Sequence, residues 1–203
     1  MSNTLSTQEE ESVMLNQHPG SPNDMSILSF TNSHHGRTMG ALSCTNAANP
    51  FNTLDIPRFK WPVAPYPKVK YPLEAHVKEN TAEENRCLDE TRKLLKDGKP
   101  RVVGLMVEPL QGANGNYFAS PNFYKGLRAL CDEFDIAFLV DEVNSGVGST
   151  GKMWAYEHWG DVQPDIVTFA KKMQVSGYYT TRDFRPKSAY QIFNTWMGDP
   201  LRL

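Results

Sequence analysis

The sequence predicts an α/β fold in which a mostly parallel sheet is flanked by helices. Three short runs, residues 102–107, 136–140 and 166–169, have the near-continuous apolar character of strands buried on both faces. Segments with helical periodicity alternate with these runs, and such alternation is typical of a parallel sheet. A charged side chain stands where each run stops. Because ligands bind outside the carboxyl ends of the strands in such sheets, we expect a ligand site there.

The chain divides into an N-terminal arm and one partial domain that contains a proline-rich segment. Residues 1–25 are polar and broken by proline and glycine, which predicts an arm or a short helix. The remainder, residues 26–203, is expected to form one partial domain, opening with a strand at 26–30 and a polar loop that carries two histidines. Residues 55–73 are dense in proline. Because proline lacks the amide proton that a sheet ladder needs, we expect a packed, extended surface meander there, and neither helix nor central strand.

Helix signals follow at three places. Thr81 and Glu84 match a capping box, which predicts a helix from Thr81 to Asp97 that stops at Gly98. Its buried face is expected to contain Cys87, Thr91, Leu94 and Leu95. Ser120 and Pro121 predict the start of a second helix, whose apolar positions are Phe123, Leu127, Leu130 and Phe134. A short helix is expected at 154–159.

Glu108, Asp141 and Lys171 are the charges that follow the three predicted strands. A buried acid and a buried amine at one sheet edge suit pyridoxal phosphate chemistry, in which the amine forms a Schiff base and the acid keeps the ring nitrogen protonated. Taken singly, each residue has a structural explanation: Asp141 could be a turn residue, and Lys171 with Lys172 a solvated pair. In an extended chain, one of two adjacent lysines would enter the site while the other reached solvent.

Bulk properties exclude several function classes. The 203 residues include 39% hydrophobic and 22% charged residues, which is ordinary for a globular domain, and the net charge of −2 offers no footprint for nucleic acid. No apolar run approaches the roughly 18 residues that span a bilayer, so no membrane association is expected. The three cysteines lack metal-site spacing, and His34 with His35 lacks a third ligand, so no metal is expected.

Longer motifs make the chain resemble a known family. They are Leu28-Ser-Phe-x-x-x-His-His-Gly-Arg-Thr-Met-Gly40, Val107-Glu-Pro109, Leu139-Val-Asp-Glu-Val143 and Thr168-Phe-Ala-Lys-Lys-Met173. Together they are similar to the class-III pyridoxal phosphate-dependent aminotransferases. The proline-rich segment and Ile192-Phe-Asn-Thr-Trp-Met-Gly-Asp-Pro200 narrow the resemblance to the eukaryotic 4-aminobutyrate aminotransferases. The resemblance extends from about Met14 to Pro200 and implies the central part of the large domain of a fold-type I transferase.

The resemblance implies a role for each matching residue. Lys171 would form the Schiff base, and Asp141 would pair with the nitrogen of the pyridine ring. Arg37 would receive the substrate carboxylate, and Glu108 would pair with a second arginine of the family. His34, His35 and Asn144 would surround the cofactor, although the family usually has an aromatic residue at His34 and glutamine at Asn144. Thr195 would reach the phosphate of the partner subunit's cofactor, which implies a homodimer.

The implied reaction is the transamination of 4-aminobutyrate with 2-oxoglutarate, giving succinate semialdehyde and glutamate. Two alternatives stay open: a catalytically inactive fragment with weak or no cofactor binding, and an aminotransferase for ornithine or another ω-amino acid. The family's N-terminal phosphate loop, its C-x-x-C and its C-terminal small domain have no match here, so no iron–sulfur cluster is expected. The resemblance implies the mitochondrial matrix, although residues 1–12 do not resemble a transit peptide; otherwise the location would be the cytoplasm.

Overall fold

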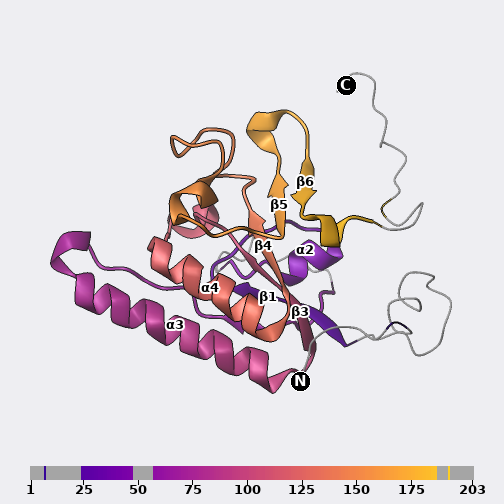
Figure 1. The fold of residues 1–203 in the computed structure, drawn as a ribbon, viewed down its shortest axis with the longest axis horizontal. Helices are drawn as coiled ribbons and strands as arrows, with labels where there is room; N and C mark the ends of the chain where they lie inside the picture. Colours follow the sequence, from indigo (N-terminus) through magenta and orange to yellow (C-terminus); the bar gives the residue numbers. More distant parts are fainter. Residues whose placement is uncertain (1–6, 8–23, 48–56, 187–191, 193–203) are drawn as a thin grey trace.

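The computed structural model describes residue 7, residues 24–47, residues 57–186 and residue 192. Within these ranges the chain forms a six-stranded sheet of order β2-β1-β3-β4-β5-β6 (Figure 1). Five strands are parallel and β6 is antiparallel to β5. The strands are β1 Met25–Phe30, β2 Val63–Ala64, β3 Arg101–Val107, β4 Ala137–Asp141, β5 Ile166–Phe169 and β6 Gly177–Thr180. The predicted α/β fold with a mostly parallel sheet is confirmed.

Two long helices, α3 (Val77–Asp97) and α4 (Pro121–Phe134), cover one face of this sheet (Figure 1). The predicted apolar positions of α4 are buried at Phe123, Leu127 and Leu130, and they pack in one core with strand residues such as Leu105 and Phe138. Fully burying such a side chain contributes about 1.5–3 kcal/mol. The core therefore holds α4 firmly against the strands whose ends carry the candidate residues.

The predicted start of the first helix is wrong by four residues. Helix α3 begins at Val77, and the hydroxyl of Thr81 donates to the carbonyl oxygen of Val77 inside the helix. The carboxylate of Glu84 does not fold back on its own helix. It accepts from the amide and the hydroxyl of Ser120, at 2.7 and 2.6 Å, and so joins α3 to the start of α4. The other end is as predicted, with Gly98 in the left-handed conformation.

The proline-rich segment contributes a short edge strand, which the sequence did not predict. Val63 and Ala64 pair in parallel with Ser29 and Phe30 of β1. A sheet edge tolerates proline because the outer side of the strand needs no amide donor. The short helix α2 (Met39–Ser43) and strand β6 were also not predicted. The short helix expected at 154–159 is present as a 3₁₀ helix, Ala155–Trp159.

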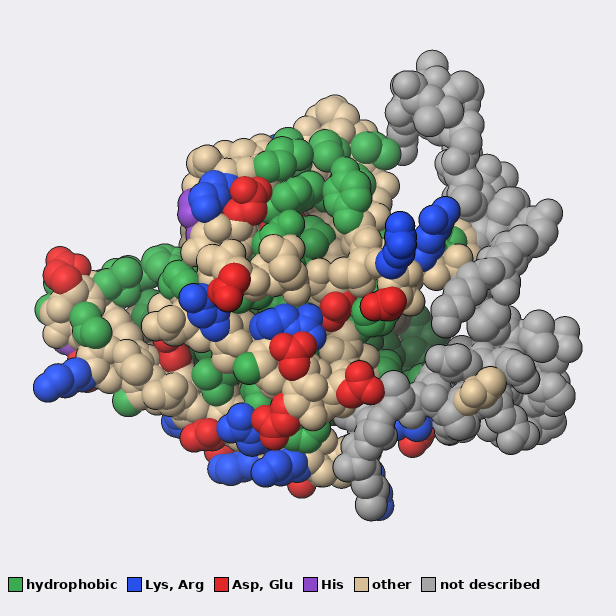
Figure 2. Space-filling view, in the orientation of Figure 1, with side chains coloured by type: hydrophobic (Ala, Val, Ile, Leu, Met, Phe, Trp, Pro, Cys, Tyr) green, Lys and Arg blue, Asp and Glu red, His purple; other side chains and the backbone are tan. Residues whose placement is uncertain are grey.

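The surface is mixed in charge. Basic and acidic side chains are interspersed on the face shown in Figure 2, and hydrophobic side chains gather over the β5–β6 hairpin. The exposed apolar residues there include Val175, Tyr178 and Tyr179. No helix in the described part of the chain combines the length and the hydrophobicity needed to cross a membrane.

Candidate active site at the carboxyl edge of the sheet

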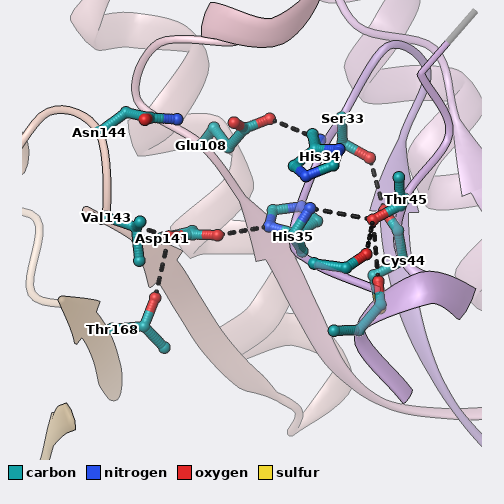
Figure 3. A network of polar contacts seen from close by, with 12 residues as sticks. Ser33, His34, His35, Cys44, Thr45, Glu108, Asp141, Val143, Asn144 and Thr168 are labelled. Atoms are coloured by element: carbon teal, nitrogen blue, oxygen red, sulfur yellow. Dashed lines mark hydrogen bonds and ion pairs between the residues drawn. The ribbon is translucent and has the colours of Figure 1, made fainter. Parts of the chain in front are cut away.

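Parallel pairing brings the predicted residues to one edge. Val107 lies opposite Val140 and Asp141 lies opposite Thr168, so Glu108, Asp141 and the start of the Lys171 turn follow one another along the carboxyl ends of β3, β4 and β5. The loop after β1 adds His34 and His35 from the side, as Figure 3 shows. Residues that are more than 100 positions apart in the sequence thereby form one polar group.

Asp141 is the centre of this group. Its Oδ1 accepts from the hydroxyl of Thr168 at 3.0 Å and from the amide of Val143 at 3.1 Å, and its Oδ2 lies 2.7 Å from Nδ1 of His35 (Figure 3). Because an ionised carboxylate can only accept, this contact fits the tautomer of His35 in which Nδ1 is the donor. Both side chains are almost completely buried. The aspartate is thus fixed in direction by three donors from three segments of the chain.

Glu108 has a different environment. Its Oε2 accepts a hydrogen bond from the amide of His34 at 3.0 Å. Only 2% of the residue is exposed. Burial raises the pKa of the Glu108 carboxyl to about 7, against a usual 4.5. Burial and the charge of Arg37 lower the pKa of the His34 imidazole. The site therefore holds a carboxyl group that can exist in either protonation state near neutral pH.

Lys171 lies in a 3₁₀ turn just beyond β5. The expectation of a buried amine is wrong, because the residue lies in a turn outside the sheet and is exposed. Its φ of 52° places the backbone in the left-handed region, which is uncommon for a residue other than glycine and is often found at functional sites. Its amine donates to Oδ1 of Asn144, and the amine of Lys172 donates to the Asn144 carbonyl oxygen at 2.7 Å. The prediction that the two lysines point to opposite sides is wrong, because the chain turns there and both amines reach Asn144.

Arg37 stands at the end of the histidine loop and is exposed. Gly36 precedes it with a φ of 131°, and a Cβ there would lie 3.1 Å from Cβ of Ala41. Glycine is therefore required for the chain to pass α2 at this point. Thr195 lies outside the described residues, so its predicted role stays a prediction.

Two residues of the site were missed by the sequence reasoning. Thr168 donates to Asp141, and the register of parallel strands could have indicated it. Gln111 is fully buried and donates from Nε2 to the carbonyl oxygen of Thr31 at 2.9 Å. Nothing in the sequence pattern distinguished Gln111 from an ordinary loop residue.

Unsatisfied polar atoms mark this edge as a place for a ligand. Four of the buried side-chain atoms that lack a hydrogen-bond partner among the described residues lie at this edge: Nδ1 of His34, Nε2 of His35, Oε1 of Glu108 and Oε1 of Gln111. Leaving such groups unpaired costs about 1–3 kcal/mol each, so their gathering at one edge indicates that a polar ligand completes them. The fixed carboxylate of Asp141 suits a cationic ring nitrogen, and Lys171 provides a primary amine for a carbonyl group.

Comparison with known proteins gives a family. The family model described as aminotransferase class-III matches residues 6–203. A 4-aminobutyrate aminotransferase of Emericella nidulans is 51% identical over 199 residues, which are 97% of this chain and 40% of the relative. The mitochondrial 4-aminobutyrate aminotransferase of Homo sapiens is 50% identical over 200 residues, again 97% of this chain and 40% of the relative. The chain thus spans about 40% of the length of these curated relatives.

Solved structures agree with this result. A lysine aminotransferase from M. tuberculosis superposes with a TM-score of 0.70 at 37% identity, covering 77% of this chain and 35% of the neighbour. An (S)-enantioselective ω-transaminase from Thermomicrobium roseum gives a TM-score of 0.67 at 29% identity, covering 78% of this chain and 36% of the neighbour. The fold and the sequence therefore point to the same group of proteins.

Proposed function

Because the chain belongs to the class-III aminotransferase family, we propose that it binds pyridoxal 5′-phosphate at the carboxyl edge of its sheet and acts in the transamination of 4-aminobutyrate with 2-oxoglutarate. The products would be succinate semialdehyde and glutamate. The observation that carries the proposal is the buried Asp141, fixed by His35, Thr168 and Val143 beside a lysine-bearing turn.

The residues present fit this cofactor. Asp141 offers a buried carboxylate to the protonated ring nitrogen, and the neighbouring His34 and His35 each carry a ring nitrogen that has no partner within the described ranges. Asn144 lies beside the Lys171 amine, where its amide can bind the ring hydroxyl. When bound, pyridoxal phosphate supplies an electron sink for the carbon that exchanges its amine.

Side chains of this protein are proposed to have the remaining roles in the reaction. Arg37 binds the substrate carboxylate through its planar pair of donors, and the Lys171 amine carries the proton to and from the reacting carbon. Because Asp141 is buried, water would be excluded from its contact with the ring nitrogen of a bound cofactor. Glu108, with its raised pKa, can exist neutral or ionised, which suits a group that pairs with an arginine in one half-reaction and releases it in the other. Thr195 is proposed to contact the cofactor phosphate of a second subunit, in a homodimer.

The cellular location is proposed from the relatives alone. The human relative is named as mitochondrial, and on that ground we place the whole protein in the mitochondrial matrix. A second candidate is a chain that folds but captures the cofactor weakly and does not turn over, and it is favoured by His34 and Asn144, which stand where the family usually has an aromatic residue and glutamine.

The test uses the purified 203-residue chain and added pyridoxal phosphate. We expect a visible absorbance band that 4-aminobutyrate bleaches faster than ornithine or lysine does, with release of succinate semialdehyde. A faster response to ornithine or lysine would reject the substrate assignment. If no band forms at saturating cofactor, this chain is not an enzyme by itself, and the second candidate holds.

A further inference from the structure

The histidine loop is held from behind by one fully buried hydroxyl group, that of Thr45. Its Oγ1 accepts from the amide of His35 at 3.0 Å and lies 2.9 Å from the carbonyl oxygen of Gly36 and 3.0 Å from that of Ala41. The single hydroxyl proton serves these two carbonyl oxygens. Figure 3 shows Thr45 directly behind His35, on the side away from Asp141.

This position connects Thr45 to both reactive ends of the loop. The hydroxyl of Thr45 accepts a hydrogen bond from the amide of His35, and the ring of His35 contacts Asp141 at 2.7 Å. The carbonyl group that it binds belongs to Gly36, the residue before Arg37. A shift of this short loop would therefore move the imidazole relative to Asp141 and also the origin of the arginine side chain.

The proline-rich segment braces Thr45 from the other side. Nη1 of Arg58 donates to the Thr45 carbonyl oxygen at 2.7 Å, and the amide of Phe59 donates to the hydroxyl of Ser43 at 2.9 Å. The end of α2 is thereby tied to the segment that leads into β2. This gives the start of the proline-rich motif a place in the site although it touches none of the candidate catalytic groups in the described contacts.

We propose that Thr45 is a positioning residue of the active site: its hydroxyl sets the loop that presents His35 to Asp141 and Arg37 to the substrate carboxylate, and Arg58 braces it. The proposal rests on the function proposed above for its catalytic meaning, whereas its geometric part can be tested without the cofactor.

The variants distinguish the effect of losing the Thr45 hydroxyl group from a general disturbance of the fold. Thr45→Val keeps the shape and removes the hydroxyl, and Thr45→Ser restores it. Thr91→Val is the matched control, because Thr91 is equally buried and its hydroxyl donates to the carbonyl oxygen of Cys87 inside α3, on the helix that lies away from the site. Arg58→Gln removes only the outer brace.

The first readout is hydrogen exchange in the cofactor-free chain. We expect Thr45→Val to accelerate exchange of the His35 amide about tenfold or more and to abolish the protected Nδ1 proton of His35, while amides of β4 keep their protection. Thr45→Ser and Thr91→Val should stay within about twofold of the parent, and Arg58→Gln should fall between. Parent-like exchange in Thr45→Val, or equal acceleration in Thr91→Val, would overturn the proposal.

The second readout is kinetic. In the cofactor-loaded protein, Thr45→Val should raise the KM for both carboxylate substrates about tenfold, and Thr45→Ser should recover most of this loss. Parent-like KM values in Thr45→Val would reject the catalytic part of the proposal. If the parent chain captures no cofactor, the proposed function fails, and the exchange experiment alone decides whether Thr45 sets the loop.

Discussion

The two edges of the sheet use polar and charged side chains in opposite ways. At the amino edge, Oδ2 of Asp165 accepts from Nη1 of Arg128 and from the amide of Phe138, both at 2.7 Å, and Arg128 also pairs with Asp132 at 2.7 Å. The guanidinium lies 5.5 Å from the centre of the Phe138 ring, and one nitrogen, Nε, has no partner among the described residues. At the carboxyl edge, by contrast, four buried polar atoms lack partners in the part of the chain that the structure describes.

The difference favours the cluster at the carboxyl edge as the ligand site. A hollow of about 490 Å³ lies at the amino edge, lined by Arg128, Asp132 and Asp165 among others, yet its charges are used in holding α4 against β4 and β5. Charges that compensate one another within the fold contribute stability. Groups that are held in place but left incomplete indicate chemistry. Changes at the two edges should accordingly separate loss of function from loss of stability.

The largest expected effect is at Lys171. Lys171→Ala should abolish covalent capture of pyridoxal phosphate, because the only reacting amine proposed for the site is removed, whereas Lys172→Ala should retain capture. Borohydride reduction followed by mass spectrometry would measure both variants. Capture by Lys171→Ala equal to that of the parent would show that the assignment of the reactive lysine is wrong.

Asp141→Asn comes next. The amide keeps the shape but removes the negative charge that faces His35 and the proposed ring nitrogen, so we expect turnover to fall roughly 10²–10³-fold while cofactor capture persists. The check is kcat measured at saturating cofactor. A variant with parental kcat would place the electron-sink partner elsewhere.

Glu108→Gln should change the pH dependence of stability. Because burial raises the folded-state pKa of Glu108 to about 7, its contribution to stability is full below about pH 4.5 and is lost as the pH rises through about 7. The neutral glutamine should remove this decline, which amounts to up to about 3 kcal/mol. Urea unfolding of both proteins at several values between pH 4 and 8 would measure it, and parallel curves would refute the raised pKa.

The smallest effect is expected at the amino edge. Asp165→Asn should lower the free energy of unfolding by about 2 kcal/mol, because it weakens the contacts to Arg128 and Phe138 in a partly exposed position. Cofactor capture should not change. Asp161→Asn is the matched control, since Asp161 is 94% exposed and pairs loosely with Lys125 at 3.7 Å. A loss of capture in Asp165→Asn would contradict the division between the edges.

Much of the fold could be predicted because local patterns and tertiary packing agree there. The apolar runs of β3 and β4 form strands with mostly buried residues, and the periodic positions of α4 face the core. The third run forms β5 as expected, but only Val167 in it is buried. The start of α3 failed where tertiary contacts override a local motif, because Glu84 binds Ser120 of another element. Strand β6 has two exposed tyrosines in its centre and no apolar run, so nothing local distinguished it from a loop.

The sequence could predict that several candidate residues share one edge, but it predicted neither their contacts nor Thr168 and Gln111. That Glu108, Asp141 and Lys171 share an edge follows from parallel strands. The bond between His35 and Asp141 joins residues 106 positions apart and depends on how the loop after β1 is anchored. That anchoring involves Thr45, whose hydroxyl carries no recognisable sequence signal.

The left-handed backbone conformation of Lys171 affects which substitutions at this position would be favoured during evolution. A non-glycine residue in that conformation costs of the order of 1 kcal/mol, which glycine would relieve and asparagine would reduce. Mutation under selection for folding alone would therefore favour replacement of this lysine early. Among close relatives of this chain, its retention at position 171 would be a record that the amine, and not merely the folded domain, is still in use.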